Sequence, residues 1–227
     1  MDIFILVLDI IGAIAFAYSG VVVAIRHKMD LLGVVLLGCI TACGGGFFRD
    51  IVLGVKPISL FDTPNWELIA ASITSFVLFI VFYFLKDLSF FEKYWFKTSV
   101  TIADAIGLGV FVVMGANVAL KETTNWFMVV FLATLTATGG GILRDLLAMR
   151  IPVIFSRHIY AVAAIMEALI YYSMYLNNVN LYVTTIISIV FVVIVRVIAY
   201  RFQVNLPSVD LTSKKHQEID EKEDLIN

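Results

Sequence analysis

The chain has 227 residues, of which 61% are hydrophobic and 15% are charged, and its formal net charge is −2. Soluble domains are about 45–50% apolar and about 25% charged. The excess of apolar residues excludes a water-soluble enzyme, a nucleic-acid-binding protein and a secreted disulfide-stabilised domain. The composition therefore predicts an all-α protein that crosses a membrane several times.

Seven charge-poor runs follow one another along the chain, and each is close to the ~20 residues that a membrane-spanning helix needs. They lie at roughly 3–25, 31–53, 67–85, 99–120, 126–149, 158–176 and 181–200. Strands of a membrane barrel alternate polar and apolar residues over only about ten residues, so we interpret these runs as seven transmembrane helices. The polar sequence after residue 202 is typical of a disordered tail.

Basic residues are distributed unequally between the connections. Those after the first, third, fifth and seventh helices, together with the tail, contain eleven Lys and Arg residues, whereas those after the second, fourth and sixth contain only Lys56 and Lys121. Short cytoplasmic connections of membrane proteins are enriched in Lys and Arg. We therefore expect the N-terminus outside the cell and the C-terminus in the cytoplasm.

The sequence contains an internal repeat, which appears when the chain is shifted against itself by 95 residues. Over positions 9–57 against 104–152, 18 of 49 aligned pairs are identical without a gap. Three of the identical pairs are charged: Asp9 and Asp104, Arg49 and Arg144, and Asp50 and Asp145. Each copy contains three helices, and an odd number of crossings reverses the direction of the chain. The second copy is therefore inverted relative to the first.

This repeat divides the chain into four parts. We expect a first three-helix repeat at 1–96, an inverted second repeat at 97–177, a seventh helix without a counterpart at 178–202, and a polar cytoplasmic tail at 203–227. Inverted repeats are a recurring plan of proteins that move solutes through the membrane. A duplicated structural bundle without a pathway is the alternative.

A run of three glycines lies within the second helix of each repeat: Gly44, Gly45 and Gly46 in the first, and Gly139, Gly140 and Gly141 in the second. One glycine costs a helix about 1 kcal/mol relative to alanine, so three should weaken or break it. Broken helices occur at membrane depth where the backbone faces protein or water, which favours a hinge that lines a pathway. Close packing between helices is the other interpretation, because small residues let backbones approach, and the two interpretations are compatible.

Charged residues flank both glycine runs. Buried charges in a membrane normally pair or face water, so we expect Asp9 to pair with Arg49, and Asp104 with Arg144. Each cluster is completed by the aspartate that follows its arginine and then holds two acids and one base. Its net charge of −1, if all groups are ionised, favours a cation. Salt bridges that only hold the helices together are the alternative.

Other ionisable residues lie at membrane depth or near the membrane surface. Glu167 has no partner visible in the sequence, and it either lines the pathway or is buried structurally. We interpret Glu67, beside Trp66, as a charge at a helix N-terminus, and Arg196 as a side chain that extends to the cytoplasmic face. No nucleotide-binding loop or zinc-site motif is present, so transport is expected to be passive or driven by an ion gradient, with no metal site.

Two inverted three-helix repeats, a seventh helix and a GGGxxRD motif in the second and fifth helices resemble the trimeric intracellular cation channel family, in its bacterial and archaeal branch. The similarity covers roughly residues 3–200. It implies a homotrimer in the membrane lipid, with a pore for potassium within each subunit and with glycine-kinked second and fifth helices lining that pore. The lysine-containing motif of animal members is absent here, where Arg-Asp stands instead.

The resemblance leads to an expected function and to one competitor. We expect a potassium-permeable channel of the bacterial inner membrane, without enzyme activity, without a nucleotide or nucleic-acid partner, and without a cofactor beyond the permeating ion. Some bacterial relatives are proposed to carry glycine. A secondary transporter of a small amino acid such as glycine is therefore the alternative.

Overall fold

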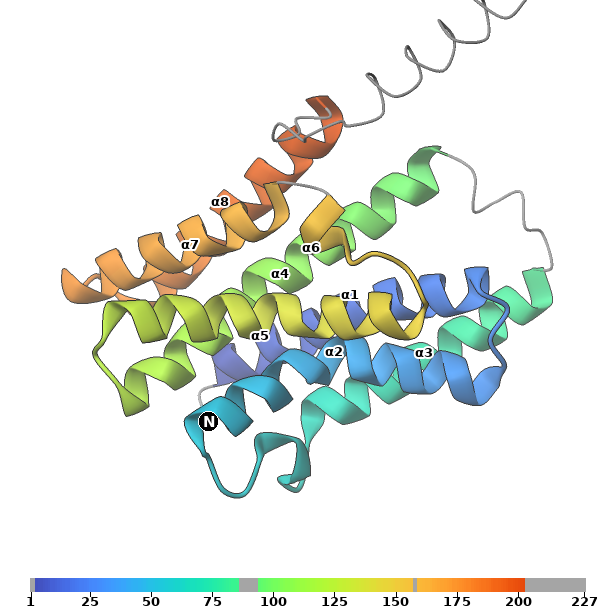
Figure 1. The fold of residues 1–227 in the computed structure, drawn as a ribbon, viewed down its shortest axis with the longest axis horizontal. Coiled ribbons are helices and arrows are strands. Elements are labelled where there is room, and N and C mark those ends of the chain that lie inside the picture. The colour runs from blue at the N-terminus through green and yellow to red at the C-terminus, as the bar shows by residue number, and fades with distance from the viewer. Residues whose placement is uncertain (1–2, 86–93, 157–158, 203–227) are drawn as a thin grey trace, which may run out of the picture.

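The computed structural model describes residues 3–85, 94–156 and 159–202, and every regular element in these residues is a helix. In chain order the helices are α1 (Ile3–Arg26), α2 (Leu31–Leu53), the 3₁₀ helix η1 (Ser59–Phe61), α3 (Trp66–Leu85), α4 (Tyr94–Glu122), α5 (Trp126–Leu147), α6 (Val153–Ser156), α7 (Ile159–Leu176) and α8 (Leu181–Phe202). The expected all-α fold is confirmed (Figure 1).

Six of these helices, α1 to α5 and α8, are long and apolar enough to cross a membrane. The apolar part of α7 is shorter, at Tyr160–Leu176, and the whole helix has 18 residues. The short helices η1 and α6 were not expected from the sequence. Helix α4 begins at Tyr94, so the predicted boundary between residues 96 and 97 falls within its first turn. The predicted tail at 203–227 lies outside the described residues.

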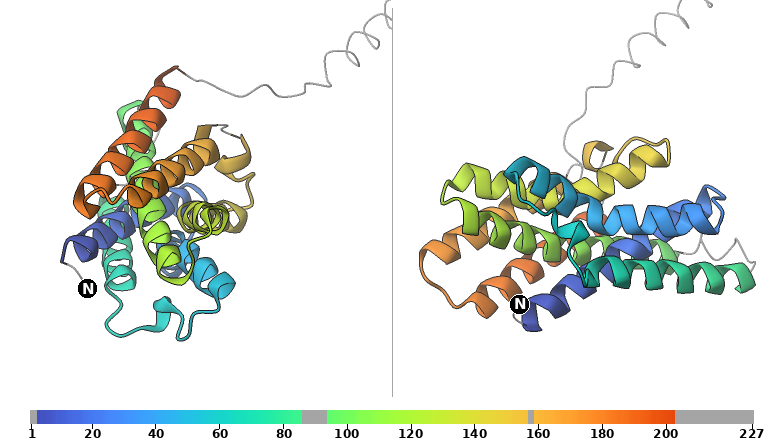
Figure 2. Two further views of the ribbon diagram at one scale, coloured as in Figure 1. Left: turned by 90° about the vertical axis from the view of Figure 1, so that its left-hand side faces the viewer. Right: turned by 90° about the horizontal axis from the view of Figure 1, so that it is seen from below.

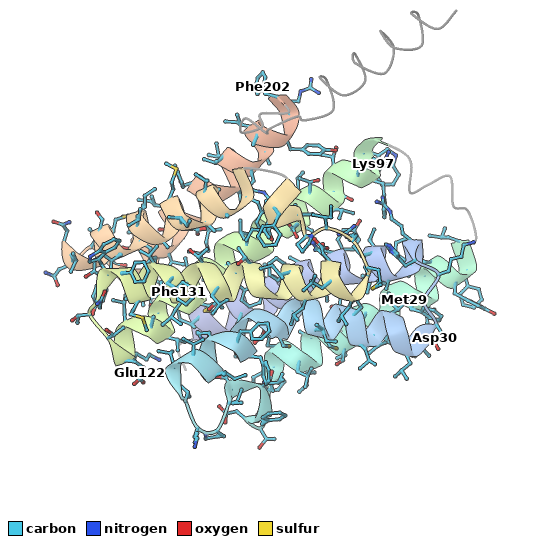
Figure 3. All side chains as sticks on the ribbon, viewed as in Figure 1. Met29, Asp30, Lys97, Glu122, Phe131 and Phe202 are labelled. Atoms are coloured by element: carbon cyan, nitrogen blue, oxygen red, sulfur yellow. The ribbon has the colours of Figure 1, made fainter. Side chains whose placement is uncertain are left out.

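Polar residues define the ends of the helices that carry the glycine runs. The Asp30 carboxylate accepts a hydrogen bond from the Gly33 backbone N–H at 2.8 Å at the start of α2. At the start of α5, the side-chain oxygen of Asn125 accepts one from the Phe127 backbone N–H at 3.0 Å. Such caps satisfy N–H groups that have no partner within the helix. Gly54 ends α2 with a φ of 69°, a left-handed conformation that glycine adopts without a steric penalty. Figure 3 shows Asp30 at the start of α2.

Equivalent residues of the two repeats make equivalent contacts. A Cβ on Gly12 would meet Val110 and Phe111, and a Cβ on Gly107, 95 residues on, would meet Phe16. The rings of Phe16 and Phe111, also 95 residues apart, lie 5.1 Å from each other. Reciprocal contacts of this kind are generated by a twofold axis. The two repeats therefore pack through a pseudo-twofold contact between α1 and α4, which α2 and α5 continue.

Helix α8 breaks this symmetry. It packs against α4 and α7 of the second repeat, and Figures 1 and 2 place it at the edge of the bundle. The first repeat has no corresponding helix among the described residues, and α3 is the least buried of the six membrane-length helices. The exposed side chains of α3 include Phe76, Val77 and Phe84. An apolar outer surface of this kind suits contact with lipid.

Candidate functional site

The glycine runs lie where α2 and α5 touch. A Cβ added to Gly45 would stand 1.8 Å from the carbonyl oxygen of Thr136, and one added to Gly140 would stand 2.0 Å from the carbonyl oxygen of Thr41. The first glycines of the runs are also close to the facing helix. A Cβ on Gly44 would meet the Leu143 side chain at 2.7 Å, and one on Gly139 would meet the Gly45 Cα at 3.1 Å. The helices are therefore in backbone contact, which only residues without a side chain permit.

The glycines do not interrupt either helix. Helix α2 is continuous from Leu31 to Leu53 and α5 from Trp126 to Leu147, so the predicted break is wrong for this conformation. The reason is tertiary, because the close contact between α2 and α5 offsets the weak helix propensity of glycine. The third glycine of each run is different: a Cβ on Gly46 or Gly141 would find no atom closer than 3.4 Å. Whether the runs line a pathway remains a prediction.

A buried ion-pair network lies at the C-terminal end of α5. Arg144 binds Asp104 of α4 at 3.2 Å and its neighbour Asp145 at 2.8 Å, and it donates to the Ser19 hydroxyl of α1 at 2.6 Å. The predicted Asp104–Arg144 pair is therefore formed. On its other side, Asp104 binds Arg196 of α8 at 2.9 Å. We call the set Asp104, Arg144, Asp145, Arg150 and Arg196 the second-repeat cluster.

Asp145 connects this cluster to the segment that follows α5. Its Oδ2 accepts the backbone N–H of Val153, the first residue of α6, at 2.8 Å, and its Oδ1 accepts from Arg150. In the first repeat, the Oδ2 of Asp50 accepts the backbone N–H of Ser59, the first residue of η1, also at 2.8 Å. Each Arg-Asp pair therefore holds the short helix after its glycine-containing helix, a role that the sequence motif does not reveal.

The first-repeat cluster consists of Asp9, Arg49, Asp50 and Glu67. Arg49 binds Asp50 at 2.7 Å. The predicted Asp9–Arg49 ion pair is not formed within the part of the chain that the structure describes, although the two groups interact electrostatically. Glu67, which the sequence placed at the membrane surface, interacts with Asp9 and Arg49, and its Oε1 is buried without a hydrogen-bond partner.

The two clusters differ in charge, which corrects the prediction of a −1 charge at both. The first-repeat cluster has three carboxyl groups and one guanidinium group, because Glu67 joins it. The second-repeat cluster has two carboxylates and three guanidinium groups, because Arg150 and Arg196 join it. Arg196 is buried and ion-paired instead of extending to the membrane surface. With all groups ionised, the clusters carry −2 and +1.

The clusters lie on opposite sides of the contact between α2 and α5. Gly45 meets Thr136 and Gly140 meets Thr41, so the two helices run antiparallel there. Asp50 and Asp145 each follow the central glycine by five residues, or about 7.5 Å of helix rise. Glu167 belongs to neither cluster: it is fully buried on α7. Among the described residues, no three His, Cys, Asp or Glu side chains are arranged to hold a metal ion.

Comparisons with known proteins extend over most of the chain. The sequence model of a family described as Glycine transporter matches residues 6–84 and 101–176. The UPF0126 membrane protein YvgT of Bacillus subtilis is 41% identical over 203 residues, which cover 88% of this chain and 94% of that protein. The UPF0126 inner membrane protein YadS of Escherichia coli is 34% identical over 202 residues, with the same shares.

A solved structure has the same fold. It is that of the TRIC trimeric intracellular cation channel orthologue from Rhodobacter sphaeroides, with a TM-score of 0.78 and 30% sequence identity. The superposition covers 88% of this chain and 99% of that one.

Proposed function

We propose a potassium-permeable cation channel as the function of this chain, which belongs to the family of the TRIC channels. Its match to the glycine-transporter family model and its UPF0126 relatives fit the same family. The observation that carries the proposal is the similarity to solved TRIC cation channels, one of them at a TM-score of 0.79, with 32% identity over 90% of this chain. We further propose a homotrimer in the bacterial inner membrane, with the N-terminus outside and a route within each subunit.

We place the route along the contact between α2 and α5, between the two clusters. The acid-rich first-repeat cluster supports a preference for cations at the outer mouth, because fixed negative charge raises the local concentration of cations. The two helices are in backbone contact in this conformation, so conduction requires them to part. A contact made by glycine Cα atoms suits such a movement, since no interlocked side chains have to be withdrawn.

Reconstituted protein tests the channel directly. Liposomes that contain the purified chain and are loaded with potassium should release it rapidly without valinomycin when a counter-ion pathway is supplied. Protein-free liposomes under the same gradient provide the baseline. Slow, saturable uptake of glycine without potassium release would contradict the proposal and support the amino-acid transporter.

Asp9 provides a test of the outer mouth. Changing Asp9→Asn is expected to lower potassium flux severalfold at low ionic strength and much less at high ionic strength, because salt screens the attraction that the carboxylate exerts. Asp62→Asn is the matched control, since Asp62 is exposed in the loop before α3. Equal potassium flux from the two variants at low ionic strength would show that Asp9 does not act on cations in the route.

A further inference from the structure

A carboxyl group on α7 and hydroxyl groups on its two neighbours α5 and α8 are buried without hydrogen-bond partners among the described residues. Glu167 on α7 has 0% exposed surface, and neither of its carboxyl oxygens has a hydrogen-bond partner among the described residues. The hydroxyls of Ser188 on α8 and Thr134 on α5 are buried without partners in the same way. An unpaired buried polar group costs about 1–3 kcal/mol, and an ionised carboxylate costs much more. A ligand that binds these oxygens would offset this cost.

The register of α7 against α8 brings Ser188 close to Glu167. At one end of this helix pair, the Arg196 guanidinium lies 4.0 Å from the centre of the Tyr160 ring. At the other end, Tyr171 lies beside Thr185. Along two antiparallel helices, residues that lie opposite each other have numbers with a constant sum, and these two pairs have the same sum. That total places Glu167 opposite the residue that follows Ser188, and Ser188 is itself fully buried.

Helix α5 brings Thr134 to the same level. A Cβ on Gly141 would lie 3.4 Å from the Tyr160 hydroxyl. Thr134 precedes Gly141 by seven residues and Glu167 follows Tyr160 by seven, so about two turns of each antiparallel helix place both side chains at one level and on the facing sides. Thr134 is also turned by about 200° from Thr136, the residue that contacts α2. The three groups thus lie on the side of α5 away from the α2–α5 contact.

No positive side chain within residues 3–85, 94–156 and 159–202 forms an ion pair with Glu167. Among the ion pairs of the described residues, the arginines bind Asp50, Asp104 and Asp145, and none binds Glu167. The second-repeat cluster is separated from it by about two helix turns, or about 10 Å. Carboxylate and hydroxyl oxygens are ligands that alkali and other hard cations accept in place of water.

We propose that Glu167, Ser188 and Thr134 contribute oxygen ligands to an occluded binding site for one monovalent cation, Na⁺ or K⁺, which is separate from the conduction route. The cation compensates the carboxylate and gives both hydroxyl oxygens a partner, so it holds α7 against α5 and α8. This site does not depend on the proposed channel, because it lies on the other side of α5.

The test is thermal stability of the full-length protein in detergent. Choline chloride is replaced stepwise by NaCl or by KCl at constant ionic strength, and the Tm is measured by size-exclusion chromatography after heating. A ligand that binds only the folded state raises the Tm as its concentration rises. We expect this rise for wild type with at least one of the two salts, loss of the rise in Glu167→Gln, and a severalfold higher cation requirement in Ser188→Ala.

The matched control is Glu122→Gln at the exposed end of α4, which Figure 3 labels; it should respond like wild type. Cations bound in the conduction route stabilise all variants equally and cancel in the comparison. Absence of a cation-dependent rise in wild type, or an unchanged rise in Glu167→Gln, would overturn the site. If Glu167→Gln does not fold, an unchanged cation requirement in both Ser188→Ala and Thr134→Val would overturn it equally. Potassium flux is measured separately, so failure of the channel proposal remains distinguishable.

Discussion

Replacing Gly45 by alanine is expected to destabilise the folded protein by about 3 kcal/mol, the upper part of the range for overpacking. The added Cβ would stand 1.8 Å from the Thr136 carbonyl oxygen, and this obstacle is backbone, which cannot rotate away as a side chain can. The helices α2 and α5 must therefore separate or tilt. Gly140→Ala should have a similar effect, because its Cβ would meet the Thr41 carbonyl oxygen at 2.0 Å.

The matched control lies in the same run of glycines. Gly46→Ala should be tolerated, because its Cβ would meet only the Arg49 guanidinium, at 3.6 Å, and because alanine favours the helix by about 1 kcal/mol. The Tm of each purified variant in detergent provides the comparison. Equal Tm values for Gly45→Ala and Gly46→Ala would show that the contact between α2 and α5 has room for a methyl group at Gly45.

Asp104→Asn is expected to cost about 3–5 kcal/mol, the range for removing one partner of a buried ion pair. Asp104 is bound by both Arg144 and Arg196, which are themselves buried. Its loss leaves Arg196 without an acidic partner among the described residues, and it raises the net charge of the second-repeat cluster from +1 to +2. Unfolding in urea or a shift of Tm measures the cost.

The equivalent residue of the first repeat should behave differently. Asp9→Asn removes one of three carboxyl groups that face one guanidinium, so its stability should change little while its potassium flux falls. Adding Arg196→Met to Asp104→Asn should recover part of the lost stability, since it removes the unpaired guanidinium; such a double-mutant cycle isolates the interaction. Equal destabilisation by Asp9→Asn and Asp104→Asn would contradict the charge difference between the clusters.

The helices and the repeat could be predicted because both depend on patterns within the chain. Apolar runs of membrane length set the positions of the long helices to within a few residues, except that α4 begins five residues earlier than expected. The 95-residue shift anticipated the reciprocal contacts, such as that between Phe16 and Phe111. It also aligned Asp104 with Asp9 and Arg144 with Arg49. In the second repeat, the predicted ion pair between Asp104 and Arg144 is formed.

The partners of those residues could not be predicted, because they depend on contacts between segments far apart in the chain. Arg196 reaches Asp104 across 92 residues, and nothing in the sequence of α8 indicates that the helix packs against α4. Glu67 begins a helix, a position that suits a surface charge equally well. The glycine runs were ambiguous for a physical reason: helix propensity predicts a break, and only the contact of α5 with α2 explains why both helices stay continuous.

Single-channel recording in a planar bilayer distinguishes a potassium channel from a slow carrier. Purified wild-type protein in a potassium gradient should give discrete current steps that reverse toward the potassium equilibrium potential, because a channel passes ions far faster than a carrier completes its cycle. A preparation that shows no current steps, yet accumulates glycine slowly and saturably in liposomes, would contradict the account.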